Sequence, residues 1–279
     1  MFGGIATKGR LLALARGAAR GEIRVYDLAD STLRSRFSYG GTEGGWADAG
    51  GIDLDEEGRI FVADTAGGRL RIFSSFGHEV GGFGLPEEAS RPRDLKGMLA
   101  YPRSVVRDGT GRLWITCGDR PWVHGLQVFD AQGRFLSSLE AFGDRSRSFG
   151  PALDLTLFGE DVWVADTGND ALQVWRLDGG FLCSFEIPRD WGRRPQAIAA
   201  VGDRLALLLA EPRPRVLLVD RDFKRTGICR LPRNQTLENP SGLARGPEGR
   251  LFVLDRDGSR VLAFEGDGEF AEVYLEIAD

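Results

Sequence analysis

Two aspartates are the residues of this sequence best suited to hold a metal ion. Asp53 and Asp154 occupy one repeat position at which other copies of a recurring segment carry small apolar residues, namely Ala6, Val106, Ala199 and Ala244. Calcium prefers clustered oxygen ligands, and two carboxylates in a mostly apolar ring could supply part of such a cluster. They could equally bind water or backbone N–H groups. A calcium site and a structural role are therefore alternative hypotheses for this pair.

The chain offers few groups for other metal or nucleophilic chemistry. Its only histidines are His78 and His124, so one chain cannot supply a three-histidine metal site. Its three cysteines, Cys117, Cys183 and Cys229, are odd in number and lack metal-type spacing, so we expect free, mostly buried thiols. No spacing typical of a Ser/His/Asp or Cys/His nucleophile can be assigned. The sequence therefore identifies no catalytic residue.

Segments rich in tryptophan and arginine are the other candidates for function. Arginine offers bidentate hydrogen bonds to carboxylate or phosphate and stacks on aromatic faces, and exposed tryptophan contributes contact area. We predict a ligand-binding surface made of Trp46, Arg91, Arg93, Arg120, Trp122, Arg145, Arg147, Trp191, Arg193, Arg194 and Arg233. In the alternative interpretation these arginines form ion pairs in ordinary solvated loops with Glu87, Glu88, Asp94, Asp144, Asp190 and Glu238.

The charge and apolar content of the chain restrict its partners and location. The 279 residues carry 36 Lys and Arg against 41 Asp and Glu, a formal net charge of -5. A mildly acidic chain lacks the basic signature of phosphate-driven binding, so RNA ranks below protein or peptide as a partner. No stretch approaches the roughly 18 apolar residues of a membrane span. The N-terminus lacks the pattern of a signal peptide. We expect a cytoplasmic protein, or a periplasmic or secreted one if a leader has been removed.

One pattern recurs along the whole chain and must position these residues. It is clearest at 50–73, 151–175 and 240–264, each of which reads as strand, turn, strand, turn and strand. Three weaker copies lie between them. A large apolar residue closes the third strand of all six copies, at Tyr26, Phe73, Phe129, Trp175, Val219 and Phe264, with spacings of 47, 56, 46, 44 and 45 residues. A period of this length indicates a repeat architecture.

Each copy predicts one four-stranded sheet. A Gly or Asp turn and a fourth, poorer strand follow the closing residue, as at 133–142 and 179–187. Short strands bounded by Gly, Asp and Pro turns are typical of antiparallel meanders. Because these sheets are partly apolar on both faces, each needs a neighbour on each side. We therefore predict an all-β fold, a six-bladed β-propeller of four-stranded antiparallel blades that forms a single domain over residues 1–279.

The order of the strands predicts how the ring closes. The chain begins in a first-type strand near 4–7 and ends in a fourth-type strand near 271–277. Every blade can then come from contiguous sequence. We predict that the first and last blades close the ring by side-chain packing, without a strand exchanged between the termini.

The segment at 240–264, PSGLARGPEGRLFVLDRDGSRVLAF, resembles the NHL repeat. VADT at 62–65 and VADTGN at 164–169 look like the conserved turn of that family. We expect Asp64, Asp166 and Asp255 to hydrogen-bond the adjoining turn, as Asp does where chains reverse. The third and fifth copies depart from the pattern, with Cys117 and Leu209 at the Asp position.

The resemblance implies a six-bladed propeller but leaves several functional classes open. NHL propellers include protein- and RNA-binding modules and sensors of extracellular ligands. A related lyase uses a histidine-bound metal, and calcium-dependent lactonases share the architecture. Two histidines argue against the lyase chemistry in this chain.

The predicted function follows from one face of the propeller. Loops from a fourth strand to the next first strand lie on the same face as loops between second and third strands. Those at 40–49, 85–100, 143–148, 188–195 and 232–239 are unusually elaborated. We predict a non-catalytic binding scaffold that recognises a protein, peptide or acidic small ligand on this face and needs no cofactor. The alternative is a calcium-dependent hydrolase of the lactonase type, with Asp53 and Asp154 as ligands.

Overall fold

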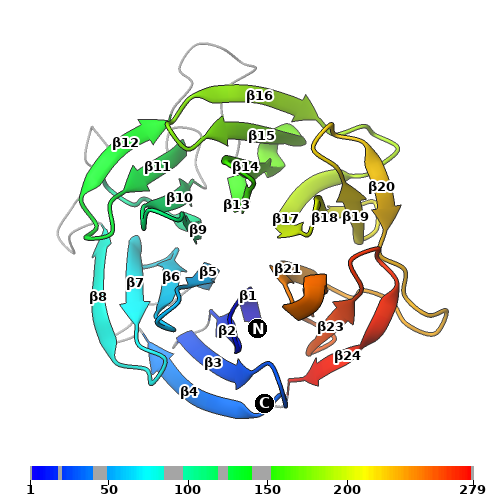
Figure 1. The fold of residues 1–279 in the computed structure, drawn as a ribbon, viewed down its shortest axis with the longest axis horizontal. Helices are drawn as coiled ribbons and strands as arrows, with labels where there is room; N and C mark the ends of the chain where they lie inside the picture. Colours follow the sequence, from blue (N-terminus) through cyan, green and yellow to red (C-terminus); the bar gives the residue numbers. More distant parts are fainter. Residues whose placement is uncertain are drawn as a thin grey trace.

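The strands form six antiparallel sheets around a central axis, as Figure 1 shows. The computed structural model describes residues 2–17, 21–39, 49–84, 97–118, 125–139 and 152–277. Each sheet has four strands, so the predicted all-β, six-bladed propeller is confirmed. Helix within these ranges is confined to two three-residue 3-10 turns, Thr167–Asn169 and Pro247–Gly249. No helix in the described ranges is long and apolar enough to cross a membrane.

The strands follow one another along the chain, four to a blade. Blade 1 contains β1 (Phe2–Lys8), β2 (Leu11–Arg16), β3 (Gly21–Asp27) and β4 (Leu33–Tyr39). Blade 2 contains β5 (Ala49–Leu54), β6 (Ile60–Asp64), β7 (Arg69–Phe73) and β8 (Glu79–Gly84). Blade 3 contains β9 (Pro102–Arg107), β10 (Leu113–Cys117), β11 (Gly125–Phe129) and β12 (Phe135–Leu139).

The second half of the ring repeats this arrangement. Blade 4 contains β13 (Ala152–Phe158), β14 (Asp161–Asp166), β15 (Ala171–Arg176) and β16 (Phe181–Glu186). Blade 5 contains β17 (Arg193–Val201), β18 (Arg204–Glu211), β19 (Arg215–Val219) and β20 (Arg225–Ile228). Blade 6 contains β21 (Pro240–Arg245), β22 (Leu251–Asp255), β23 (Arg260–Phe264) and β24 (Phe270–Glu276).

The strand register confirms the predicted repeat. The six closing residues all pair with the matching residue of the second strand, as Tyr26 pairs with Leu12 and Phe264 with Leu251. Each of the six is at most 6% exposed. Burying an aromatic side chain removes about 150 to 250 Å² from water, so this position is a main source of stability in the five blades that carry an aromatic residue there, and Val219 fills it in blade 5.

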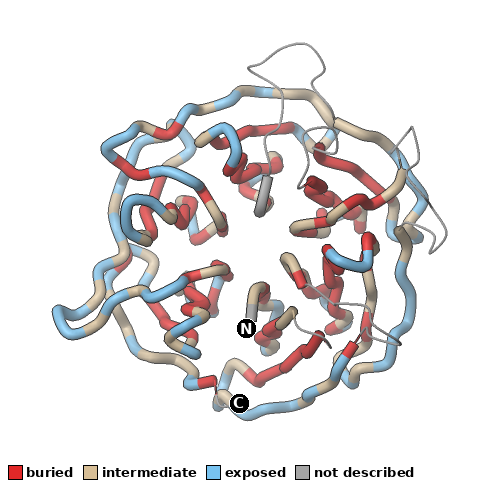
Figure 2. Tube along the Cα trace, turned by 180° about the vertical axis from the view of Figure 1, so that it is seen from behind, coloured by how far each residue is buried: buried red, intermediate tan, exposed pale blue. Residues whose placement is uncertain are grey.

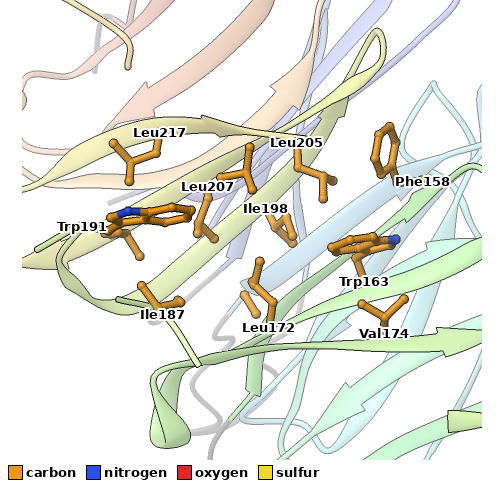
Figure 3. Packing of buried hydrophobic residues seen from close by; sticks show 13 residues of the cluster. Phe158, Trp163, Leu172, Val174, Ile187, Trp191, Ile198, Leu205, Leu207 and Leu217 are labelled. Atoms are coloured by element: carbon orange, nitrogen blue, oxygen red, sulfur yellow. The ribbon is translucent and has the colours of Figure 1, made fainter. Parts of the chain in front are cut away.

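The hydrophobic core is divided among the blade interfaces. Six clusters of buried residues occur, and each joins two neighbouring blades. Figure 2 shows that the second and third strands of the blades are the most buried and that the outermost strands are more exposed. Figure 3 shows the cluster between blades 4 and 5, where Trp163 and Leu172 meet Ile198 and Leu205. Each blade therefore needs both neighbours, as the two-sided apolar pattern predicts.

The ring closes by packing between blades 1 and 6, as predicted. Strands β1 to β4 form one sheet and β21 to β24 another, with no strand exchanged. Ile5 and Leu12 of blade 1 belong to one buried cluster with Phe252 of blade 6. The Tyr274 hydroxyl donates a hydrogen bond of 2.8 Å to the Leu28 carbonyl. Side chains and this polar contact replace the covalent continuity that joins the other blades.

The aspartates that end the second strand have the expected structural role at two of three positions. Asp64 accepts a hydrogen bond of 3.0 Å from the N–H of Gly67, and Asp166 accepts one of 2.9 Å from the Asn169 side chain. Both partners lie in the adjoining turn. Asp255 instead accepts the N–H group of Asn239 at 2.9 Å and so holds the loop that precedes β21.

Candidate functional site: the loop face and the central channel

A central channel of about 840 Å³ runs between the six inner strands. Its walls are β1, β5, β9, β13, β17 and β21, which surround the opening in Figure 1. We call the end reached by the loops before each inner strand the loop face, and the opposite end the turn face. The depth at which an inner-strand residue lines the channel therefore follows from its position along that strand.

Glycines allow the inner strands to approach one another closely. A Cβ atom on Gly50 would lie 2.2 Å from the carbonyl oxygen of Arg103, and one on Gly4 would lie 2.7 Å from the carbonyl oxygen of Gly50. Real Cβ atoms do not approach backbone so closely. The inner strands of blades 1, 2 and 3 therefore meet backbone to backbone at these glycines.

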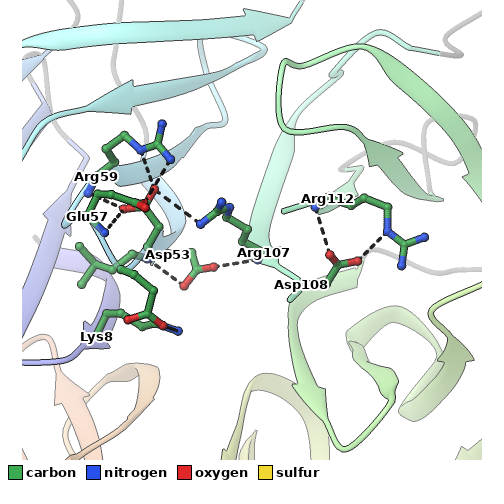
Figure 4. A network of polar contacts seen from close by, with 10 residues as sticks. Lys8, Asp53, Glu57, Arg59, Arg107, Asp108 and Arg112 are labelled. Atoms are coloured by element: carbon green, nitrogen blue, oxygen red, sulfur yellow. Dashed lines mark hydrogen bonds and ion pairs between the residues drawn. The ribbon is translucent and has the colours of Figure 1, made fainter. Parts of the chain in front are cut away.

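Asp53 joins two blades through its carboxylate. One oxygen accepts a hydrogen bond of 2.8 Å from the N–H group of Leu54, and the other accepts one of 2.8 Å from the N–H group of Arg107 on β9 (Figure 4). Burial raises its pKa to about 6, against the lowering effect of these N–H groups. The side chain thus lines the channel and fastens blade 2 to blade 3.

Asp154 joins three blades. One of its oxygens accepts a hydrogen bond of 2.7 Å from the Ser104 hydroxyl of blade 3, and the other accepts one of 2.9 Å from the N–H group of Ile198 in blade 5. Burial raises its pKa also to about 6, against the lowering effect of Ser104 and two N–H groups. Like Asp53, it has both oxygens occupied by donors of the protein.

The register corrects the placement of Asp154 in the repeat. Asp53 pairs with Phe61, and the matching residue of blade 4 is Thr156, which pairs with Trp163. Asp154 pairs with Ala165 and lies two residues nearer the loop face. The prediction that the two aspartates share one repeat position is therefore wrong. Both still line the channel, because residues two apart in a strand point the same way.

Calcium does not fit this pair of carboxylates as they are held. Calcium takes six to eight oxygen ligands, whereas the four oxygens of Asp53 and Asp154 are already hydrogen-bonded to N–H and hydroxyl groups. Within the described ranges, no three or more His, Cys, Asp and Glu side chains are grouped so that they could hold a metal ion. The donor set supports the structural hypothesis for this pair.

Ion pairs occupy the turn-face end of the channel, as Figure 4 shows. Asp55 accepts a hydrogen bond of 2.6 Å from Arg59 and lies 3.6 Å from the Arg107 guanidinium. Lys8 and Glu56 form an exposed pair at 3.0 Å. Positive and negative groups thus balance one another at this end.

The loop-face end carries a cation that sequence reasoning did not single out. Arg256 lines the channel, and its Nε is buried without a hydrogen-bond partner among the described residues. Its guanidinium also forms no ion pair with them. The same end is lined by three more side chains that carry N–H donors, those of Arg103, Gln196 and Asn239. This end of the channel is suited to an anionic group.

A substitution in the repeat is the signal that could have revealed Arg256. In blades 2 and 4 the residue after the second-strand Asp is Thr, and Thr65 donates to the Pro102 carbonyl of the next blade at 2.7 Å, as Thr167 does to Pro195. Arg256 stands at this position in blade 6. A charged residue therefore replaces a blade-joining hydroxyl beside the channel mouth.

Four residues of the predicted binding surface lie in the described ranges. Trp191 is 9% exposed and packs against Phe185, with ring centroids 5.9 Å apart. Its indole belongs to the core between blades 4 and 5 and is not an exposed anchor (Figure 3). Arg193, Arg194 and Arg233 are exposed on the loop face.

Two of these arginines form weak ion pairs. Arg193 lies 3.8 Å from Asp170, and Arg194 lies 3.3 Å from Glu211, with more than half of each arginine side chain exposed. Exposed pairs contribute about 0 to 1 kcal/mol, so a ligand carboxylate can replace either acid at little cost. Arg233 has no ion-pair partner in the part of the chain that the structure describes.

The other predicted surface residues lie outside the described ranges. They are Trp46, Arg91, Arg93, Arg120, Trp122, Arg145 and Arg147. His124 lies outside them as well, whereas His78 is exposed on the turn between β7 and β8. The assembly of the whole Trp and Arg surface stays a prediction.

Comparisons with known proteins identify the architecture through structure. No family model and no curated protein matches the sequence. A streptogramin B lyase structure matches with a TM-score of 0.68 and 14% identity, covering 99% of this chain and 84% of that chain. A nidogen/laminin complex contains a chain with a TM-score of 0.67 and 13% identity, covering 92% and 89%.

A second lyase structure gives the same result. A catalytically inactive virginiamycin B lyase from Staphylococcus aureus with quinupristin matches with a TM-score of 0.67 and 15% identity, covering 98% of this chain and 83% of that chain. At such identities the likeness shows the fold alone. The chain therefore shares its fold with lyase structures and with a chain of a nidogen/laminin complex.

Proposed function

We propose that this protein is a non-catalytic binding scaffold whose loop face and channel mouth bind an acidic segment of a protein or peptide. The observation that carries the proposal is Arg256, a channel-lining cation with a buried Nε and no acceptor among the described residues. A guanidinium left without an acceptor favours a carboxylate partner, because it can form two parallel hydrogen bonds to it.

The exposed arginines extend this positive surface. Arg193, Arg194 and Arg233 lie on the face where the channel opens, and the pairs of Arg193 and Arg194 with Asp170 and Glu211 are exposed. A peptide with several carboxylates can contact the channel mouth and these arginines together. An acidic small ligand is the second candidate, because a channel of about 840 Å³ is large enough to admit one.

The resemblance to the NHL repeat supports a binding role. That family includes protein-binding propellers, and we propose membership on the VADT and VADTGN segments at 62–65 and 164–169. A chain of similar fold in a nidogen/laminin complex also favours a protein partner. The calcium-dependent hydrolase receives no comparable support, since both oxygens of Asp53 and of Asp154 already accept hydrogen bonds.

Calorimetric titration with hexaglutamate tests the proposal. The wild-type protein should bind it with an affinity that falls as salt increases, because the contacts are charged. Arg256→Gln should weaken binding by at least about tenfold, the loss expected for one charge-assisted hydrogen bond. Citrate, titrated in parallel, distinguishes an acidic small ligand from an extended acidic segment.

Arg204→Gln is the matched charge control. Arg204 begins β18 at the turn face and forms an exposed pair of 3.7 Å with Asp203. Its replacement should leave the affinity within about twofold, because it lies away from the proposed site and loses only an exposed ion pair. Equal weakening by both variants, or no binding of either acid, would refute the proposed site.

A further inference from the structure

A second pocket opens on the turn face, between blades 4 and 5, remote from the loop-face mouth of the channel. It has a volume of about 170 Å³. Its lining residues are Phe158, Asp161, Trp163, Val174, Leu182, Cys183, Arg221 and Phe223. Three aromatic rings and a few polar groups thus surround a space that suits a small ligand.

The Trp163 indole N–H is buried in this pocket without a partner. Trp163 is 4% exposed, and its Nε1 has no hydrogen-bond partner among the described residues. In Figure 3 the nitrogen lies on the side of the ring away from Leu172 and Ile198, toward the end of the cluster that holds Phe158. Buried polar groups are nearly always hydrogen-bonded, so this donor requires an explanation.

Blade 3 shows what the repeat provides when the donor is structural. Trp114 stands at the same repeat position as Trp163, and its N–H donates a hydrogen bond of 2.9 Å to the Asp108 carboxylate. Phe158 is the residue of blade 4 that corresponds to Asp108. Blade 4 therefore has the Phe158 ring in place of a carboxylate acceptor, although it keeps the Trp163 indole, whose N–H group needs an acceptor.

Phe223 closes the same pocket from a strained position. Its φ is 59°, in the left-handed region, where a bulky residue is a genuine outlier. Four other blades carry glycine at this place in the turn between the third and fourth strands: Gly77, Gly133, Gly179 and Gly268. The ring of Phe223 lies 5.1 Å from that of Trp163 and stacks on Phe185 at 4.6 Å. Blade 1 carries Ser31 at this place, with a φ of 58°, so Phe223 is the one bulky residue that takes this conformation in the six turns between third and fourth strands. A bulky side chain kept in a strained position points to a use of that side chain.

One cation and one anion belong to the pocket lining. Arg221 is exposed, and its guanidinium lies 4.6 Å from the centroid of the Phe158 ring. It forms no ion pair within the described ranges, so its donors are available. Asp161 supplies a carboxylate and lines the pocket together with Cys183.

We propose that this pocket binds a free aromatic amino acid. The ring lies among Phe158, Trp163 and Phe223, the carboxylate accepts hydrogen bonds from Arg221 and from the Trp163 N–H, and the ammonium group pairs with Asp161. A zwitterion with an apolar ring is the ligand that complements all of these groups together. The pocket lies on the opposite face from the proposed acidic-segment site, and neither proposal depends on the other.

Calorimetric titration with L-phenylalanine tests the pocket, together with two analogues that each lack one charge. L-phenylalanine should bind one molecule per chain in the millimolar range or more tightly. We expect 3-phenylpropionate, which lacks the ammonium group, to bind more weakly, and phenethylamine, which lacks the carboxylate, to bind most weakly. Binding should also shift the Trp163 indole N–H resonance, identified by its loss in Trp163→Phe.

Matched variants separate ligand binding from packing. Trp163→Phe should reduce the affinity for L-phenylalanine by at least about tenfold, because it removes a hydrogen bond to a charged group. Trp114→Phe should leave it within about twofold, since that indole already has a partner. Phe223→Gly keeps the turn that glycine forms in other blades and should lose most of the binding. Arg221→Gln, on the exposed rim, gives a test that does not depend on the core.

The proposal fails under either of two results. One is that L-phenylalanine produces neither heat nor a shift of the Trp163 resonance at millimolar concentration. The other is that binding survives Trp163→Phe and Arg221→Gln unchanged. In that case Phe223 and the unpartnered indole serve only the packing between blades 4 and 5.

Discussion

Replacing Trp114 with Phe should destabilise the protein by about 2 kcal/mol more than replacing Trp163 with Phe, the size of one hydrogen bond to a charged group. Both indoles occupy the same repeat position and are at most 4% exposed, so the lost packing is similar. The difference isolates the N–H group. Trp114 loses its bond of 2.9 Å to Asp108, whereas Trp163 loses a donor without a described partner.

The pH dependence of this difference has a defined sign. Burial raises the pKa of Asp108, but hydrogen bonds from Thr110, Trp114 and Arg112 outweigh it and hold the pKa below 3.8. A carboxyl whose pKa is lowered by folding stabilises the protein above its ordinary value. This stabilisation is lost as the pH falls through the lowered pKa. The difference in the free energy of unfolding between the two variants should therefore have its full size at pH 7 and should decrease below about pH 4.

Urea unfolding of the two variants at pH 7 measures the gap directly. A change in midpoint without a change in slope would report stability alone. Equal losses, within about 0.5 kcal/mol, would refute the reasoning, because mutations of equal packing differ only through the hydrogen bond. A larger loss for Trp163→Phe would show that its N–H has a partner.

Three further outcomes follow from the channel and the thiols. In Asp154→Asn the amide oxygen can accept the Ile198 N–H and the amide nitrogen can donate to the Ser104 hydroxyl, and the buried charge is removed. Because folding raises the pKa of Asp154 to about 6, the ionised form opposes folding increasingly from about pH 4 to pH 6, so the variant should gain up to about 3 kcal/mol at pH 7.5 and nothing below pH 4 in urea unfolding. Burial raises the pKa of Cys117 and Cys229 to about 12, so both should resist a thiol reagent until the protein unfolds. Chelation and added calcium should leave the melting temperature unchanged, and a rise of several degrees with calcium would contradict our reading of the channel.

The fold could be predicted because each copy of the repeat has the residue types that a propeller blade needs at the same positions. A large apolar residue at the end of the third strand, from Tyr26 to Phe264, is buried in all six blades. Turn residues and two-sided apolar strands then require neighbours on both sides. The closure of the ring without strand exchange was also predictable, since the first and last strands of the chain each belong to a blade made of contiguous sequence.

The site was harder to predict because it depends on register and on neighbouring blades. Ala49 and Ala152 pair with the equivalent residues Asp64 and Asp166, and Asp53 and Thr156 each follow four residues later. Matching the similar sequences IDL at 52–54 and LDL at 153–155 therefore misaligns Asp154 with Asp53. Trp191 looks like an exposed anchor in a polar loop, but Phe185 of blade 4 covers it. Such contacts between blades leave no local pattern.

Substitutions within the repeat would have been the better guide. Arg256 replaces the threonine that joins blades elsewhere, and Phe223 replaces a turn glycine. Phe158 stands where blade 3 has the acceptor for a tryptophan. Each differs from the residue that at least one equivalent blade uses for structure, and each lies beside the channel or the second pocket.

Hydrogen exchange with and without saturating hexaglutamate tests the central claim most directly, because it locates the contact surface. Bound hexaglutamate should protect loop-face segments, including 188–195, 232–239 and the strand end at Arg256, and should leave the turns on the opposite face unchanged. Protection of the turn face, or an unchanged exchange pattern at a concentration that saturates binding, would contradict that claim.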